Sequence, residues 1–159
     1  MGRKKRAVSI PLNQNALLQF LNQKDFHPLF QKETDQTYLV MNIGEYEVPL
    51  FFLIRSENSL LQTLAYLPYQ LQEKTLGETA RLLHLLNKEL DMPGFGLDEK
   101  EDLMFYRCVI PCVDGKISEE LLLTYISCTR LACETFMGAI GTILSGSASI
   151  DELLKGKNE

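Results

Sequence analysis

The sequence lacks the features that mark membrane and secreted proteins. No stretch of its 159 residues approaches the ~20 consecutive apolar residues that a membrane-spanning helix needs. The basic start is not followed by the apolar region of roughly 7–15 residues that is typical of a secretory signal. Apolar residues make up 45% and charged residues 23% of the chain, as in ordinary soluble proteins. We therefore expect a cytoplasmic protein with a single domain and a core of its own.

The chain has only two histidines, His27 and His84, and neither indicates acid–base catalysis. His84 falls at the edge of a leucine stripe, and no cysteine or serine is placed in the sequence to form a triad with it. His27 precedes a proline in a loop-like context. We expect both to be ordinary boundary or loop residues rather than general bases.

The four cysteines do not have the spacing of a zinc site. Cys108 and Cys112 would lie about 13 Å apart on a strand. Cys128 and Cys133, five residues apart on a helix, would point to different sides. Small secreted domains that lack a core use disulfide frameworks, and this chain is large enough to have a core. The cysteines are therefore interpreted as buried structural thiols, with metal binding or redox chemistry as the alternatives.

Two loops superficially resemble ligand sites. The acidic run Asp98–Asp102 lacks the residue order of a calcium loop and its distant bidentate glutamate, so it is interpreted as a hairpin turn. Gly94–Gly96 follows a helix and has no Gly-Lys-Ser/Thr, so it is not a phosphate loop. No cofactor or metal is predicted.

The net charge of −5 conceals an asymmetry along the chain. Subtracting the +4 of Arg3–Arg6 leaves about −9 for the rest of the sequence. An acidic body argues against broad nucleic-acid binding, and neither nucleic acid nor membrane is expected as a partner. The alternative is that the basic run binds a nucleic acid or an anionic membrane. Gly2 does not indicate myristoylation, because position 6 is Arg rather than Ser or Thr.

The first half of the chain predicts a short helix and an antiparallel meander. Apolar residues fall on one face of the helix, and turns of about two and four residues separate the better strands. The expected elements are the helix Asn15–Gln23, an irregular strand Phe26–Phe30, and the strands Thr37–Ile43, Tyr46–Arg55 and Leu60–Pro68.

The second half predicts two helices around a second hairpin. Thr75 and Glu78 match a capping box at the start of the first helix, which Pro93-Gly94 ends. The hairpin pairs Phe95–Asp98 with Leu103–Ile110. A long helix, about Ser118–Leu144, follows.

This order of elements predicts an α+β fold with helices packed on an antiparallel sheet. The order is one helix, four strands of which the first is irregular, a helix, two strands and a helix. The domain is expected over residues 13–144. It is preceded by a flexible basic arm, residues 1–12, and followed by a hinge and a short amphipathic tail, residues 145–159.

Apolar surface in excess of one core is the strongest indication of function. Val48–Ile54 is apolar on both faces of its strand, so something must cover each face. The final helix is apolar over more of its circumference than one sheet contact requires. A partner or dimer surface is predicted at these residues, of which those on the sheet could equally be core: Phe51, Leu53, Leu64, Tyr66, Leu122, Ile126, Phe136 and Ile140.

Several segments together resemble the YbjN-type family of bacterial proteins, described as sensory-transduction regulators with a fold similar to class I type III secretion chaperones. The match covers about 110 residues, from Tyr38 to Ile143. The segments are "FFLIR" (Phe51–Arg55), "LLNKEL" (Leu85–Leu90), "GFGLD" (Gly94–Asp98), "LMFYRCVI" (Leu103–Ile110) and "ISEELL" (Ile117–Leu122). The resemblance implies a domain that binds protein and has no catalytic residues. Secretion chaperones are small acidic homodimers that hold an extended stretch of a secreted effector.

The sequence therefore favours a non-enzymatic, dimeric module that binds a partner protein. Binding would occur by strand addition at a sheet edge or by apolar anchors in a groove beside the last helix. One alternative is a regulator that acts through an unknown ligand, a nucleic acid or a membrane by means of Arg3–Arg6. The other is a small enzyme or ligand binder, for which Met92–Gly96 is the only place where a deep pocket is expected.

Overall fold

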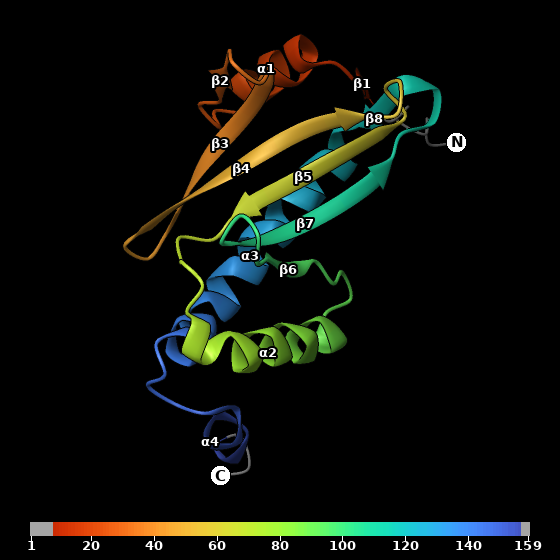
Figure 1. Ribbon diagram of the computed structural model, residues 1–159. Coiled ribbons are helices and arrows are strands. Elements are labelled where there is room, and N and C mark those ends of the chain that lie inside the picture. Colours follow the sequence, from red (N-terminus) through yellow and green to blue (C-terminus); the bar gives the residue numbers. More distant parts are fainter. Residues whose placement is uncertain (1–7, 157–159) are drawn as a thin grey trace, which may run out of the picture.

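The structure is a computed structural model that describes residues 8–156 (Figure 1). A six-stranded antiparallel sheet has the order β2-β3-β4-β5-β7-β6, and β1 and β8 form a separate two-stranded ribbon. The predicted α+β class is confirmed. The elements are β1 Ser9–Pro11, α1 Gln14–Gln23, β2 Leu29–Gln31, β3 Gln36–Ile43, β4 Tyr46–Arg55, β5 Leu60–Tyr66, α2 Leu76–Glu89, β6 Phe95–Asp98, β7 Leu103–Pro111, β8 Lys116–Ser118, α3 Glu119–Leu144 and α4 Ile150–Lys155.

The helices α1 and α3 pack on one face of the sheet, and α3 passes behind β4, β5 and β7 in Figure 1. Alternate residues of each strand point into this core; on β4 they are Val48, Leu50 and Phe52, each fully buried. From α3, Leu122 and Ile126 fill the other side. The helix α2 packs beside β6 and α3. Within residues 8–156 no helix covers the opposite face of the sheet.

The first helix packs on the sheet through the buried Leu17, Phe20 and Leu21, and the side chain of Gln14 adds hydrogen bonds to two strands. The amide of Gln14 donates to the carbonyl of Phe52 at 2.9 Å and accepts from the N–H of Thr37 at 2.8 Å. Asn13 caps the helix by accepting from the N–H of Ala16. Gln14 thereby bridges β3 and β4 at the place where α1 begins.

The capping box predicted at Thr75 and Glu78 is wrong, because both side chains bind the C-terminal segment instead. The hydroxyl of Thr75 donates to the carbonyl of Leu144 at 2.6 Å. Glu78 accepts from the N–H of Ile150 at 3.2 Å. A capping box does form at Ser149, where it begins α4. These contacts dock the end of α3 and the start of α4 onto α2, and Ile150 is only 1% exposed.

The predicted N-terminal arm extends too far along the sequence. Ser9–Pro11 pair with Lys116–Ser118 as the ribbon of β1 and β8, which the sequence did not predict. Ile10 and Leu12 are buried in the core, so the chain is part of the domain from this ribbon onward. Arg3–Arg6 lie outside the described residues.

Candidate functional site

The uncovered face of the sheet carries a continuous apolar and aromatic surface. The strand register places Tyr38, Phe51, Leu64 and Arg107 directly opposite one another across β3, β4, β5 and β7. Leu29 continues this row onto β2. Four residues from the neighbouring row on one side and two from the row on the other side extend the surface toward the ends of the strands: Val40, Pro49, Tyr66 and Phe105, and Leu53 and Val109. We call it the open face and define it by Leu29, Tyr38, Val40, Pro49, Phe51, Leu53, Leu64, Tyr66, Phe105, Arg107 and Val109.

Three aromatic rings form the centre of the open face. Tyr38 stacks on Phe51 with 4.9 Å between ring centroids, and Tyr66 meets Phe51 edge-on at 5.8 Å. Partial burial raises the pKa of the Tyr66 hydroxyl above its ordinary value. Leu64 is only 9% exposed although it is not part of the core on the helical side. Its neighbours on the open face therefore shield it, and the open face is a packed apolar layer rather than a set of isolated side chains.

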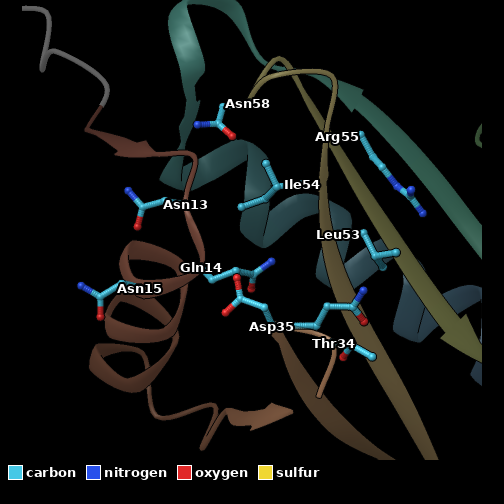
Figure 2. Close-up of a pocket in the computed structure, with 10 residues that line it drawn as sticks. Asn13, Gln14, Asn15, Thr34, Asp35, Leu53, Ile54, Arg55 and Asn58 are labelled. Carbon is cyan, nitrogen blue, oxygen red and sulfur yellow. The ribbon is translucent and has the colours of Figure 1, made fainter. Parts of the chain in front are cut away.

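The eight residues predicted as partner surface divide into two groups. Phe51, Leu53, Leu64 and Tyr66 all lie on the open face, on the adjacent strands β4 and β5. Figure 2 shows Leu53 and Arg55 on one side of β4 and Ile54 on the other.

The four predicted residues on α3 belong to the interior. Leu122 and Ile140 are fully buried and Ile126 is 4% exposed, all within the core between α3 and the sheet. Phe136 is half-buried and meets Phe95 edge-on, with 6.1 Å between ring centroids. Leu122, Ile126 and Ile140 are therefore not available as an exposed partner surface in the described chain, whereas Phe136 is only partly buried. A helical apolar stripe indicates burial without indicating what buries it.

Sequence reasoning missed seven members of the open face: Leu29, Tyr38, Val40, Pro49, Phe105, Arg107 and Val109. Arg107 is exposed, and its guanidinium carbon lies 5.7 Å from the centroid of the Phe105 ring. The alternation of Leu103–Ile110 contained this information, because it puts Phe105 and Arg107 on the face of the strand away from the buried Met104 and Tyr106. The strand register was required to connect them with β4 and β5.

The break between α2 and β6 has a structural role. The side chain of Asn87 donates to the carbonyl of Phe95 at 2.8 Å. It accepts from the N–H of Phe95 at 2.9 Å and from the N–H of Gly94 at 3.1 Å. The hydroxyl of Tyr106 donates to the carbonyl of Met92 at 2.7 Å. The "LLNKEL" and "GFGLD" segments are thus joined by hydrogen bonds that hold β6 against β7.

The sheet edges are poorly suited to the predicted strand addition. The carbonyl of Gly94 accepts from the N–H of Arg107, so the N–H and carbonyl of Phe95 point away from β7. Asn87 occupies both of them. The other edge strand, β2, has only three residues. Short or covered edges resist pairing with a further chain, which favours the open face over the edges as a binding surface.

A cleft of about 590 Å³ lies between the Met92–Gly96 break and β7. It is where the sequence placed a pocket for an enzyme or ligand binder. Phe105 and Arg107 line it, so the cleft adjoins the open face. The amide of Asn87, which also lines it, is already engaged with Gly94 and Phe95. The cleft combines one cation, Arg107, and one anion, Asp91, with the aromatic rings of Phe95, Phe105 and Tyr125.

A second cleft, of about 610 Å³, lies where α1, the turn before β3 and the end of β4 meet (Figure 2). Gln14 lines it, but both ends of its amide are bound to the backbone. A third cleft, of about 980 Å³, lies beside the end of α3, where the hydroxyl of Tyr69 donates to the carbonyl of Met137. Within residues 8–156 no three His, Cys, Asp or Glu residues are placed to hold a metal ion.

The four cysteines are free thiols, and three of them are buried. Burial raises the pKa of the Cys108 and Cys112 thiols, and raises that of Cys133 to about 12. These three thiols are therefore protonated at neutral pH, which makes them poor nucleophiles. Their placement agrees with the interpretation as structural residues.

None of the helices in the described part of the chain is long and apolar enough to cross a membrane. The sequence profile of the YbjN family, described as "Putative bacterial sensory transduction regulator", matches residues 13–142. Comparison with curated protein sequences gives no match. Among solved structures, the fold is similar to "Crystal structure of YbjN, a putative transcription regulator from E. coli". The TM-score is 0.58 at 8% identity, over 80% of this chain and 92% of that chain.

Proposed function

This chain belongs to the YbjN family, and from that premise we propose that it is a non-enzymatic module whose open face binds a segment of a partner polypeptide. The observation that carries the proposal is the packed row of Tyr38, Phe51 and Leu64 on a sheet face without a covering helix. Aromatic side chains bring large contact areas at low entropic cost and are enriched in the centres of protein interfaces.

A polypeptide suits this face better than a nucleic acid does. Strand alternation puts two cations on it, Arg55 and Arg107, and the acidic Glu47 and Asp98 toward its margins. A surface that tracks a phosphate backbone requires several positive charges, and the chain without Arg3–Arg6 carries about −9. The description "transcription regulator" belongs to the similar protein, and a regulator can act through protein contacts as well as through DNA.

We further propose a role like that of the secretion chaperones that the sequence resemblance implies. A chaperone of that kind holds an extended stretch of its client, and the open face offers aromatic and branched side chains in regular rows. We propose that the chain holds its partner segment in an extended form. A homodimer is also proposed. Since Leu122, Ile126 and Ile140 are core residues, the dimer contact must lie elsewhere than on that side of α3.

The proposal can be tested by selecting peptides from a random 12-residue phage library on the purified full chain. Selected peptides are synthesised, and their affinity is measured for the wild type and for Phe51→Ser. Leu131→Ser is the matched control, because Leu131 is 63% exposed on α3, away from the open face. We expect Phe51→Ser to weaken binding at least about tenfold, as for a central interface aromatic, and Leu131→Ser to have no effect.

Two results would contradict the proposal. One is that no peptide is selected, or that Phe51→Ser binds selected peptides as the wild type does. The other is tight binding of a (dT)20 oligonucleotide that Phe51→Ser abolishes, which would make the open face a nucleic-acid surface. Light scattering at micromolar concentration tests the proposed homodimer separately, and a monomeric protein would contradict it.

A further inference from the structure

We infer that Arg107 determines the specificity of the open face and selects partner segments in which an Asp or Glu lies two to four residues from an aromatic or branched apolar residue. The inference rests on the proposed function, since it names the chemistry of the partner at the same surface. It concerns which segments bind rather than whether the face binds.

Of the two cations on the open face within residues 8–156, Arg107 lies in the same row as the aromatic centre. It lies directly opposite Leu64 on the neighbouring strand, and Leu64 lies directly opposite Phe51. Among residues 8–156 the structure gives Arg107 no carboxylate partner. An exposed, unpaired guanidinium at the margin of an apolar patch can accept a bidentate carboxylate from a partner.

The surroundings of Arg107 position its charge. Its guanidinium lies 5.7 Å from the ring centroid of Phe105, within the range of a cation–π contact. Both side chains also line the 590 Å³ cleft beside the Met92–Gly96 break. Asp91 lines the same cleft and opposes a carboxylate that enters it deeply, so the partner carboxylate meets Arg107 at the side of the open face, which the rest of the segment crosses. Partial removal of water there strengthens a charged pair relative to a fully exposed one.

The spacing in the partner follows from the sheet geometry. Arg107 and Phe51 are separated by two strand spacings, roughly 10 Å. An extended chain covers that distance in about three residues. A carboxylate over Arg107 and an apolar side chain over Phe51 therefore belong to residues two to four positions apart.

The overall charge of the protein limits the acidity of the partner. The body carries about −9 without Arg3–Arg6, so a strongly acidic segment would be repelled before it reached the face. The second cation, Arg55, lines the cleft of Figure 2 together with Asp35, and Arg107 shares its cleft with Asp91. Each of these carboxylates opposes a second incoming acid. One acidic residue next to apolar anchors fits these constraints better than an acidic run.

The test is a comparison of peptide preferences between charge variants. The same random library is selected on the full-length wild type, on Arg107→Glu and on Arg81→Glu, at about 0.15 M salt to screen long-range charge. Arg81 is exposed on α2, so its variant changes the net charge equally without changing the open face. Circular dichroism confirms that each variant is folded, and Arg107→Gln provides a variant without a reversed charge.

We expect the wild type and Arg81→Glu to enrich Asp or Glu at the stated distance from an apolar residue. Arg107→Glu should enrich Lys or Arg at that position, and Arg107→Gln should show neither preference. A synthetic acidic peptide should bind Arg107→Glu roughly tenfold more weakly, and its Lys counterpart should restore binding.

The outcomes separate the inference from the proposed function. If the wild type selects apolar peptides without an acidic preference, or if Arg107→Glu selects the same acidic peptides, the inference is overturned while the open face remains the binding surface. If no peptides are selected, or if Phe51→Ser does not affect them, the proposed function fails and the inference fails with it.

Discussion

Replacing Asn87 with alanine should destabilise the fold more than replacing any of the exposed polar residues of α2 with alanine. The side chain makes hydrogen bonds of 2.8, 2.9 and 3.1 Å to the backbone of Gly94 and Phe95. Each such bond contributes about 0.5–1.5 kcal/mol net. Water can replace part of the loss, since Asn87 is only half-buried. We expect the free energy of unfolding to fall by about 2–3 kcal/mol.

Urea unfolding at pH 7 measures this change, and Asn22→Ala is the control. Asn22 is exposed in the last turn of α1, and its replacement should alter stability by less than about 0.5 kcal/mol. For a chain of this length, the Asn87 variant should melt about 4–12 °C lower. Hydrogen exchange should accelerate at the amides of Gly94 and Phe95. Equal stability of the two variants would refute the role assigned to the Asn87 amide.

Three further predictions concern packing and titration. Gly94→Ala would place a Cβ 2.5 Å from the carbonyl oxygen of Arg107 and should cost more than about 2 kcal/mol. A Cβ at Gly138 would meet no atom within 4 Å apart from its chain neighbours and the nearby backbone of its own helix, so Gly138→Ala should stabilise by about 0.5–1 kcal/mol. The same sign for both variants in urea unfolding would disprove the assigned geometry. Ile150→Ala removes a side chain that is 1% exposed and should lower the unfolding free energy by about 2–4 kcal/mol, and an unchanged midpoint would mean that α4 is not docked. Burial raises the pKa of the Cys133 thiol from 9.0 to about 12. The stability that comes from keeping this thiol protonated is therefore complete below pH 9 and is lost progressively as pH rises to 12. Cys133→Ala should reduce this alkaline loss of stability in urea unfolding, and a pH profile identical to that of the wild type would contradict the prediction.

The order of the elements could be predicted from the sequence because local patterns determine it. The bounds of β4 and β6 agree with the predicted strands, since turn residues end each of them. The ribbon of β1 and β8 could not be predicted, because each strand has three residues and pairs across more than 100 positions. Thr75 and Glu78 satisfied a local capping pattern, but tertiary contacts to Leu144 and Ile150 replaced it.

Four of the eight residues predicted as partner surface lie on the open face, and the others do not, because long-range contacts decide which apolar residues are covered. An apolar strand such as β4 indicates that both of its faces are covered, which drew attention to Phe51 and Leu53. The sequence did not say which residues of β3 and β7 lie beside them, because register is a non-local property. Arg107 therefore entered the site only through its position opposite Leu64. On α3, the same apolar signal came from the core contacts of Leu122 and Ile140.

Site-specific photo-crosslinking from the open face tests the central claim most directly. The photoreactive residue p-benzoylphenylalanine would replace Phe51 in one variant and Leu131 in another, each expressed in the cells that make the protein. Irradiation followed by mass spectrometry identifies what is attached to each position. The account predicts polypeptide adducts from position 51, with the attached residue inside an apolar segment that contains an Asp or Glu, and few or none from position 131. Polypeptide adducts from position 131 with none from position 51 would contradict it.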